Sequence, residues 1–306
     1  MLKEWKGIIA VPVTPFNSSN ELDVEILRQE VDYIIERKVS RAISYPMHFS
    51  EALEMSDAER RRSVEVVIER ANGKIPVIVH VSSPGTDNAL GFARHARDTG
   101  ADAIISTIPY NWGPTPDGIR AHFERLSSIG ISLFAYNPSP SYYSSQAQIP
   151  TQIIFELASK HENLVGMKDA SWNMEYFIEA VRLSTTLSRN FSILAGIEHL
   201  VPTMAVGGSG AFSALGLVFP NLLGRLYQLC ERGAFIEARP LQFKVSKLLL
   251  MLKQYKMHPT VKAIMEMQGR PAGLPRLPNT PLSATEKEAV LTTLKQIGVW
   301  ETESWS

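Results

Sequence analysis

The sequence predicts an α/β protein, and three observations support this fold class. Short apolar runs recur between residues 7 and 215, and most lack the polar alternation of a sheet with one exposed face. Stretches that carry helix start signals separate the runs. The repeat also has the length of a (β/α)₈ TIM barrel, although a doubly wound open sheet would show the same local texture.

The predicted strands are rich in β-branched residues and are bounded by turn-forming residues. These runs are continuous and do not alternate apolar with polar residues. Such runs are typical of parallel strands that are buried on both faces. The eight runs are residues 7–13, 41–46, 75–82, 101–109, 131–136, 163–168, 191–196 and 210–215.

Helices are predicted between these strands from their ends. Ser56 and Glu59 form a capping box before a helix that ends near residues 72–73. Thr115 precedes a proline at the first helical position. A helix that opens near Asp87 stops at Gly100, where a left-handed cap is expected.

The pattern changes to helix alone after Pro220. Helices are predicted at 222–232, 237–253 and 259–267, and a further capping box at 283–286 opens the last one. A proline-rich connection, 269–281, separates the last two. We therefore expect residues 1–232 to form the barrel with the active site and residues 233–306 to form a C-terminal helical extension packed on it.

Composition points to a globular protein that acts on a small molecule. Hydrophobic residues make up 44% of the 306 residues, and 31 basic residues balance 31 acidic ones, so no net field favours nucleic acid or an anionic membrane. Cys230 is the single cysteine, which excludes an intramolecular disulfide. The start has no long apolar signal segment, so we expect a soluble cytoplasmic protein.

Candidate functional residues follow from the rule that barrel active sites lie at the C-terminal ends of the strands. Polar and aromatic side chains gather at these predicted ends. They are Thr14, residues 47–51, residues 109–113, Tyr136 and Asn137, Lys168 and Asp169, Glu198, and Ser213.

The chemistry that these residue types favour is imine formation. The histidines have no metal-ligand spacing, no GxGxxG follows a strand, and no GxSxG is present, so a metal, dinucleotide or serine-nucleophile site is not expected. A desolvated lysine becomes a neutral amine that attacks a carbonyl, and a nearby phenol can relay protons. Lys168, which ends an apolar run, and Tyr136 are the natural pair, although a strand-end lysine can also simply reach solvent.

Five short motifs then resemble one family in order and spacing. They are TPF (14–16), PY (109–110), YN (136–137), GMKDAS (166–171) and GGSGAFS (207–213). The chain is similar over essentially its whole length to the dihydrodipicolinate synthase / N-acetylneuraminate lyase family. The resemblance implies a (β/α)₈ barrel with three C-terminal helices, a homotetramer built as a dimer of dimers, and a class I lyase that forms a Schiff base with pyruvate or another 2-oxo acid. It implies Lys168 as the Schiff-base lysine and Tyr136 as the proton-relaying tyrosine.

The chain departs from the family pattern after the second strand. Where the family has G-[ST]-T-G-E, this chain has MHFSE, which keeps Glu51 but places His48 and Phe49 at the hydroxyl pair. The next aromatic motif keeps Tyr110, a third catalytic candidate, and has Asn111 where a second tyrosine usually stands. No arginine follows Tyr136 and Asn137 to grip the acceptor's carboxylate.

These differences lead to an expectation about substrate. We predict an enzyme that makes or breaks a C–C bond through a Lys168 imine, with a bulkier or aromatic substrate, and not a true dihydrodipicolinate synthase. The predicted substrate-binding residues are His48, Phe49, Asn111, Glu198 and Ser213. No cofactor or metal is expected beyond the covalent imine. The alternative is a catalytically impaired family member that binds a small ligand or regulates a partner.

Overall fold

The computed structural model describes residues 4–110, 113–139 and 148–303. These residues divide into two compact units that each join distant parts of the sequence. The first unit comprises Met1–Gly7 and Pro76–Phe212, and the second comprises Ile8–Ile75 and Ser213–Ser306. Each unit is described separately below.

Eight parallel strands form a closed barrel in the order of the sequence, which confirms the predicted (β/α)₈ fold class and excludes the open sheet. All eight predicted strands are present. They are β1 (Gly7–Ala10), β2 (Ser40–Tyr45), β3 (Val77–His80), β4 (Ala103–Ser106), β5 (Ser132–Asn137), β6 (Leu164–Asp169), β7 (Ser192–Ala195) and β8 (Gly210–Ser213).

The first strand is shorter than predicted. The apolar run continues to residue 13, but β1 ends at Ala10. Pro12 has no N–H to donate to a neighbouring strand, which explains the early end. Thr14, predicted at the strand end, therefore lies in the segment that follows the strand.

Helices alternate with the strands and continue after β8. Those that alternate with strands are α1 (Val24–Arg37), α2 (Asp57–Ala71), α3 (Thr86–Thr99), α4 (Pro116–Ser127), α5 (Thr151–Lys160), α6 (Met174–Ser184) and α7 (Leu200–Ala205). Those after β8 are α8 (Pro220–Glu231), α9 (Phe235–Tyr255), α10 (Met257–Met267) and α11 (Ala284–Ile297). Two short 3₁₀ turns, η1 (His48–Ser50) and η3 (Leu215–Leu217), follow β2 and β8.

The predicted helix ends are confirmed in detail. Ser56 accepts a hydrogen bond from the Glu59 N–H and the Glu59 carboxylate accepts one from the Ser56 N–H, which is the reciprocal capping box. Thr115 caps α4 through the Gly118 N–H. Gly100 ends α3 with a left-handed backbone at φ 96°.

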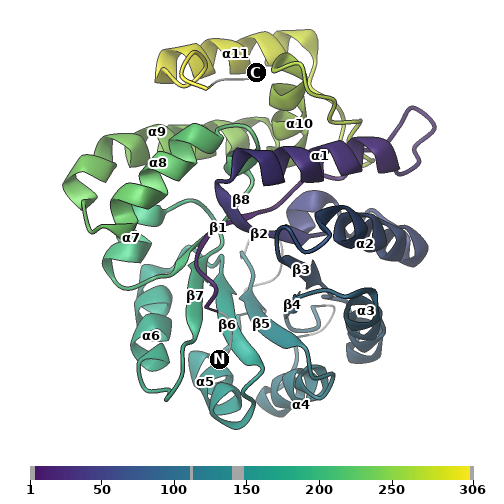
Figure 1. Ribbon diagram of the computed structural model, residues 1–306, viewed down its shortest axis with the longest axis vertical. Coiled ribbons are helices and arrows are strands. Elements are labelled where there is room, and N and C mark those ends of the chain that lie inside the picture. Colours follow the sequence, from purple (N-terminus) through teal and green to yellow (C-terminus); the bar gives the residue numbers. More distant parts are fainter. Residues whose placement is uncertain (1–3, 111–112, 140–147, 304–306) are drawn as a thin grey trace. The chain divides into compact units, whose positions relative to one another are not determined.

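In the first unit, strands β3 to β7 are flanked by helices that pack on their neighbours in sequence. Figure 1 shows α3, α4, α5 and α6 following one another around the outside of these strands. Every residue of β3, β4, β6 and β7 is buried, as expected for strands covered on both faces. The buried strands fix the backbone from which the candidate catalytic side chains project.

In the second unit, helix–helix packing dominates. Helix α1 packs against α2, and the long α9 contacts α8, α10 and α11 (Figure 1). Helix α10 also packs against η1, the turn that follows β2. The boundary predicted between residues 232 and 233 stays a prediction.

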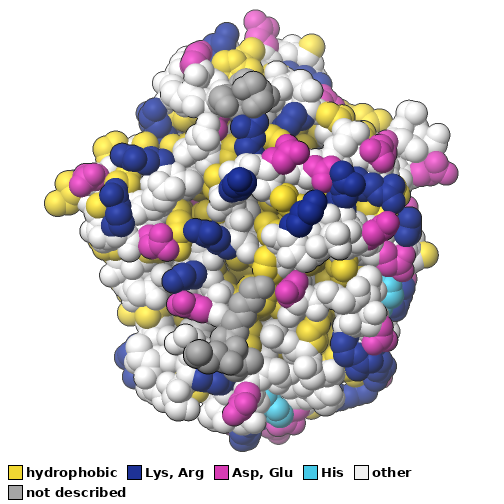
Figure 2. All heavy atoms as spheres, viewed as in Figure 1, with side chains coloured by type: hydrophobic (Ala, Val, Ile, Leu, Met, Phe, Trp, Pro, Cys, Tyr) yellow, Lys and Arg dark blue, Asp and Glu magenta, His cyan; other side chains and the backbone are white. Residues whose placement is uncertain are grey.

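The visible surface carries charges of both signs. Figure 2 shows Lys and Arg side chains interspersed with Asp and Glu over the face in view. Among the described residues, no helix combines the length and the apolar character that crossing a membrane requires.

Candidate active site

Lys168 lies one residue before the end of β6 and is buried. Only 5% of the residue is exposed. Its Nζ lies 4.4 Å from the centre of the Tyr136 ring and 4.8 Å from the centre of the Phe212 ring. Lys168 therefore ends its apolar strand in an aromatic-walled interior, and the reading of a lysine that simply reaches solvent is wrong.

Burial changes the acid–base character of this amine. Desolvation lowers the pKa of Lys168 to about 7, against the smaller opposing effect of the Glu198 carboxylate. Near pH 7, Lys168 is thus a neutral amine in a substantial fraction of the protein molecules, whereas an ordinary lysine is almost entirely protonated there. A neutral amine in an apolar site is the form that attacks a carbonyl carbon.

Tyr136 is placed beside Lys168 by the sheet itself. The two residues are direct partners in the β5–β6 register, and Tyr136 is only 2% exposed. Its ring makes an edge contact with the buried His80 ring on β3, with centroids 6.2 Å apart and planes at 71°. The Tyr136 ring and the Lys168 amine therefore lie together in the interior of the first unit.

Sequence reasoning missed His80. The run 75–82 predicts an apolar strand, but a histidine within such a run is itself a signal, because a buried imidazole needs a partner. The structure shows that this histidine contacts the ring of a predicted catalytic tyrosine.

Polar contacts lock the ends of β5 and β6 together. Asn137 donates through Nδ2 to the Asp169 carboxylate at 2.8 Å, and its Oδ1 accepts from the Ile149 N–H at 3.1 Å. The Ser171 N–H also donates to Asp169 at 3.1 Å. Burial raises the pKa of Asp169, while these hydrogen bonds oppose the shift. Asn137 directly follows Tyr136 and Asp169 directly follows Lys168, so the network holds the backbone next to both residues.

A glycine keeps the neighbouring strand end close. Gly196 follows β7, and its N–H donates to the Asp169 carbonyl at 2.6 Å. A Cβ at Gly196 would lie 2.3 Å from the Ala170 Cβ, so any other residue would force the two strand ends apart. Glu198, two residues further on, is 3% exposed and acts electrostatically on Lys168.

The remaining predicted residues lie in different surroundings. Tyr110 follows β4 and is half-buried, while Asn111 lies outside the described residues. In the second unit, His48 and Phe49 belong to η1 and are half-buried. Ser213 ends β8 fully buried, and its Oγ accepts from the Gly216 N–H at 2.9 Å. The structure thus brings together Lys168, Tyr136 and Glu198 in one unit and His48 and Phe49 in the other.

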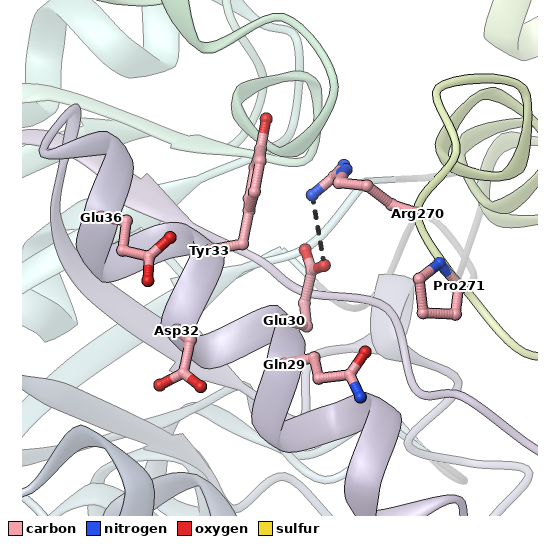
Figure 3. A pocket seen from close by; sticks show the side chains of 7 residues that line it. All are labelled: Gln29, Glu30, Asp32, Tyr33, Glu36, Arg270 and Pro271. Carbon is pink, nitrogen blue, oxygen red and sulfur yellow. Dashed lines mark hydrogen bonds and ion pairs between the residues drawn. The ribbon is translucent and has the colours of Figure 1, made fainter. Parts of the chain in front are cut away.

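A separate cavity lies in the second unit between α1 and the 270–271 segment (Figure 3). It has a volume of about 210 Å³. Arg270 donates to Glu30 at 3.4 Å and stacks on Tyr33, 3.6 Å from the ring centre. None of the seven lining residues is a lysine, so this cavity offers no imine chemistry. Within the described parts of the chain, no group of three or more His, Cys, Asp or Glu residues could hold a metal ion.

Comparison with known proteins agrees with this arrangement. A model of the Dihydrodipicolinate synthetase family matches residues 4–297. The chain is 31% identical to 4-hydroxy-tetrahydrodipicolinate synthase of Methanospirillum hungatei over 278 residues, which cover 90% of this chain and 93% of the relative. It is 29% identical to the synthase of Methanosarcina barkeri, covering 97% of this chain and all of that one.

A solved structure agrees with the sequence matches. The dihydrodipicolinate synthase of Aquifex aeolicus superposes with a TM-score of 0.88 at 28% identity and covers 96% of this chain and 99% of that one. The names of these relatives give no support to the expectation that the chain is something other than a true synthase. The chain belongs to the dihydrodipicolinate synthetase family, and with it to the Schiff-base lyases of the aldolase type.

Proposed function

We propose that Lys168 forms a Schiff base with the carbonyl carbon of a 2-oxo acid such as pyruvate, or of a related carbonyl donor, and that a C–C bond is then made or broken. The observation that carries this proposal is a buried amine, with its pKa lowered to about 7, against the Tyr136 ring. Retention of a desolvated amine beside a phenol also favours turnover over the ligand-binding alternative.

The proposed steps need no cofactor. Neutral Lys168 Nζ adds to the carbonyl carbon, and the resulting carbinolamine loses water to give a protonated imine. Loss of a proton from the adjacent carbon gives an enamine, whose carbon attacks an aldehyde acceptor, or the same steps run in reverse. Water then hydrolyses the imine and restores the amine. Tyr136 is proposed to deliver and accept the protons at the carbinolamine oxygen, with Tyr110 as a second relay candidate.

Replacing Tyr136 by Phe removes this relay while keeping the ring that covers Lys168. We expect kcat to fall by on the order of 10²-fold or more, because positioned proton transfer contributes about that much. The Tyr227→Phe variant is the control, because it removes a hydroxyl that donates to Glu231 on the same helix, α8, at 2.9 Å. Steady-state turnover of the same donor and acceptor compares the two, and an unimpaired Tyr136→Phe enzyme would remove Tyr136 from the mechanism.

We propose His48 and Phe49 as the residues that set substrate choice, with Asn111, Glu198 and Ser213 as further substrate-binding residues. Phe49 stands where a hydroxyl is usual in the family, so the side chain at this position is apolar. His48 supplies a hydrogen-bond donor, or a cation when protonated, toward a carboxylate. This chemistry favours a bulkier or aromatic carbonyl substrate.

The substrate proposal is tested by exchanging the two side chains. In the His48→Thr/Phe49→Thr variant, kcat/KM for aromatic aldehydes should fall by about 10- to 200-fold relative to small aldehydes, the range that one pocket contact supplies. Turnover of pyruvate with an aldehyde panel measures this ratio. If the unmodified protein instead forms 4-hydroxy-tetrahydrodipicolinate faster than any other product, the chain is a true synthase and the proposal is wrong.

A homotetramer remains our proposal for the assembly, on the strength of the family resemblance. Exposed apolar side chains on and beside α6 support an interface there. They are Trp172, Met174 and Ile178, at 44%, 36% and 46% exposure.

A further inference from the structure

The turn that carries His48 and Phe49 is fastened on its strand side by buried hydrogen bonds. Ser50 Oγ donates to the Pro12 carbonyl at 2.5 Å and accepts from the Met47 N–H at 3.1 Å. Thr14 Oγ1 donates to the Ser50 carbonyl at 2.5 Å and lies 2.8 Å from the Tyr45 hydroxyl. The turn is therefore held at its last residue by the segment after β1.

Glu51, which ends the turn, is held by residues of the chain after β8. It ends η1 in the left-handed region at φ 57°, which is an uncommon conformation for a residue with a Cβ. Its carboxylate is fully buried and accepts from Lys262 Nζ at 2.6 Å and from the Arg276 N–H at 2.7 Å. Both donors come from the chain after β8, more than 200 positions away in the sequence.

Lys262, the partner of Glu51, is itself buried. It lies on α10 and is 2% exposed. Besides Glu51, its Nζ donates to the Leu274 carbonyl at 2.7 Å and lies 5.2 Å from the centre of the Phe16 ring. Burial lowers the pKa of Lys262, and the Glu51 carboxylate opposes the shift. Because Lys262 is buried among these partners, its positive charge balances the negative charge of the Glu51 carboxylate.

His258, on the same helix, contacts Phe49. The two rings meet edge-on, with centroids 6.1 Å apart and planes at 90°. His258 Nε2 also lies 3.9 Å from the Glu51 carboxylate. Burial, followed by the nearby Lys262 charge, lowers the pKa of His258 to about 4, so the ring is neutral at pH 7 and packs as an aromatic surface. Helix α10 therefore holds both Phe49 and Glu51.

We propose that Lys262 and His258 are positioning residues: through Glu51 and Phe49 they hold the His48–Ser50 turn in the shape that receives the substrate. This inference rests on the proposed function of that turn. It gives the C-terminal extension a part in substrate binding, because α10 supplies the counter-charge and the ring on which the turn is built. Neither residue needs to touch the substrate.

The test uses the full chain and neutralises the pair without leaving an unpaired charge. In the Glu51→Gln/Lys262→Met variant, the half-saturating pyruvate concentration for borohydride trapping should rise at least tenfold, while the limiting trapping rate stays within threefold. His258→Ala should raise the half-saturating pyruvate concentration about threefold. His258→Phe, which keeps a ring, should leave that concentration at the value of the unmodified protein. Lys287→Met is the matched control, because it removes a lysine from a partly exposed ion pair with Glu266, at 2.8 Å, that joins α11 to α10.

A second readout is independent of activity. Amide hydrogen exchange of the 47–52 segment, followed by mass spectrometry, should be at least tenfold faster in the Glu51→Gln/Lys262→Met variant and unchanged in Lys287→Met. Unchanged half-saturation in the Glu51→Gln/Lys262→Met variant overturns the inference, whether or not exchange accelerates. If the unmodified protein traps no carbonyl compound, the proposed function fails, and unchanged exchange would then overturn the positioning claim separately.

Discussion

Lys168→Met is expected to abolish imine formation and, at the same time, to stabilise the fold. The folded state lowers the pKa of Lys168 from 10.5 to about 7, so at pH 7.5 folding must strip a proton from a group that is protonated when unfolded. Removing that proton on folding costs on the order of 2 to 4 kcal/mol. A methionine of similar length at this position does not carry this cost. The same burial that makes the amine reactive therefore destabilises the protein.

The stabilisation expected from Lys168→Met depends on pH. Because the folded pKa is lowered, the penalty is largest at and below pH 7 and shrinks as the pH rises toward 10.5, where the unfolded lysine also loses its proton. Urea unfolding at pH 7.5 and 9.5 should thus show a stabilisation by Lys168→Met that is smaller at the higher pH. Lys160→Met, at an exposed ion pair with Glu156, is the control. A Lys168→Met protein that is less stable than the original would mean that the lysine is not desolvated.

Lys262→Met alone is expected to cause the largest loss of stability of any single change discussed. The Lys262–Glu51 pair is 2% and 0% exposed, and removing the lysine leaves a buried carboxylate without its counter-charge. Breaking a buried pair from one side costs about 3 to 5 kcal/mol. Replacing both partners by neutral residues avoids that penalty, so the Glu51→Gln/Lys262→Met protein should be more stable than Lys262→Met.

Denaturant unfolding of the two proteins measures this difference directly. Lys287→Met, which breaks a surface pair, should change the free energy of unfolding by less than about 1 kcal/mol. Equal stability of Lys262→Met and the unmodified protein would show that Glu51 finds another partner or reaches solvent.

Much of the barrel could be predicted because its signals are local. Continuous apolar runs identify strands buried on both faces. Capping residues such as Ser56, Thr115 and Ser283 mark helix starts, because each side chain accepts a hydrogen bond from the backbone N–H three residues later. Several strands are shorter than the predicted runs, and the early end of β1 has a local cause in Pro12. Choosing a barrel over an open sheet needed the resemblance, since both share these local patterns.

The candidate site was predictable only in part, for a physical reason. Lys168 and Tyr136 stand at strand ends, where the barrel topology says that side chains converge. Lys262 and His258 contact residues far along the chain, and nothing in their immediate sequence marks them. His80, in contrast, stands out as a histidine within an apolar run. Glu51 is the one residue of the family motif that this chain keeps at this turn, and the sequence alone does not show its contacts with Lys262 and the Arg276 backbone.

The most direct test of the central claim is borohydride reduction in the presence of pyruvate, followed by peptide mapping. We predict a reduced adduct on Lys168, formed more rapidly at pH 8 than at pH 6 because the neutral amine is the reactive form. An adduct on another lysine, or none with pyruvate or with ketones and aldehydes that lack a carboxylate, would contradict the proposal that Lys168 is an imine-forming residue.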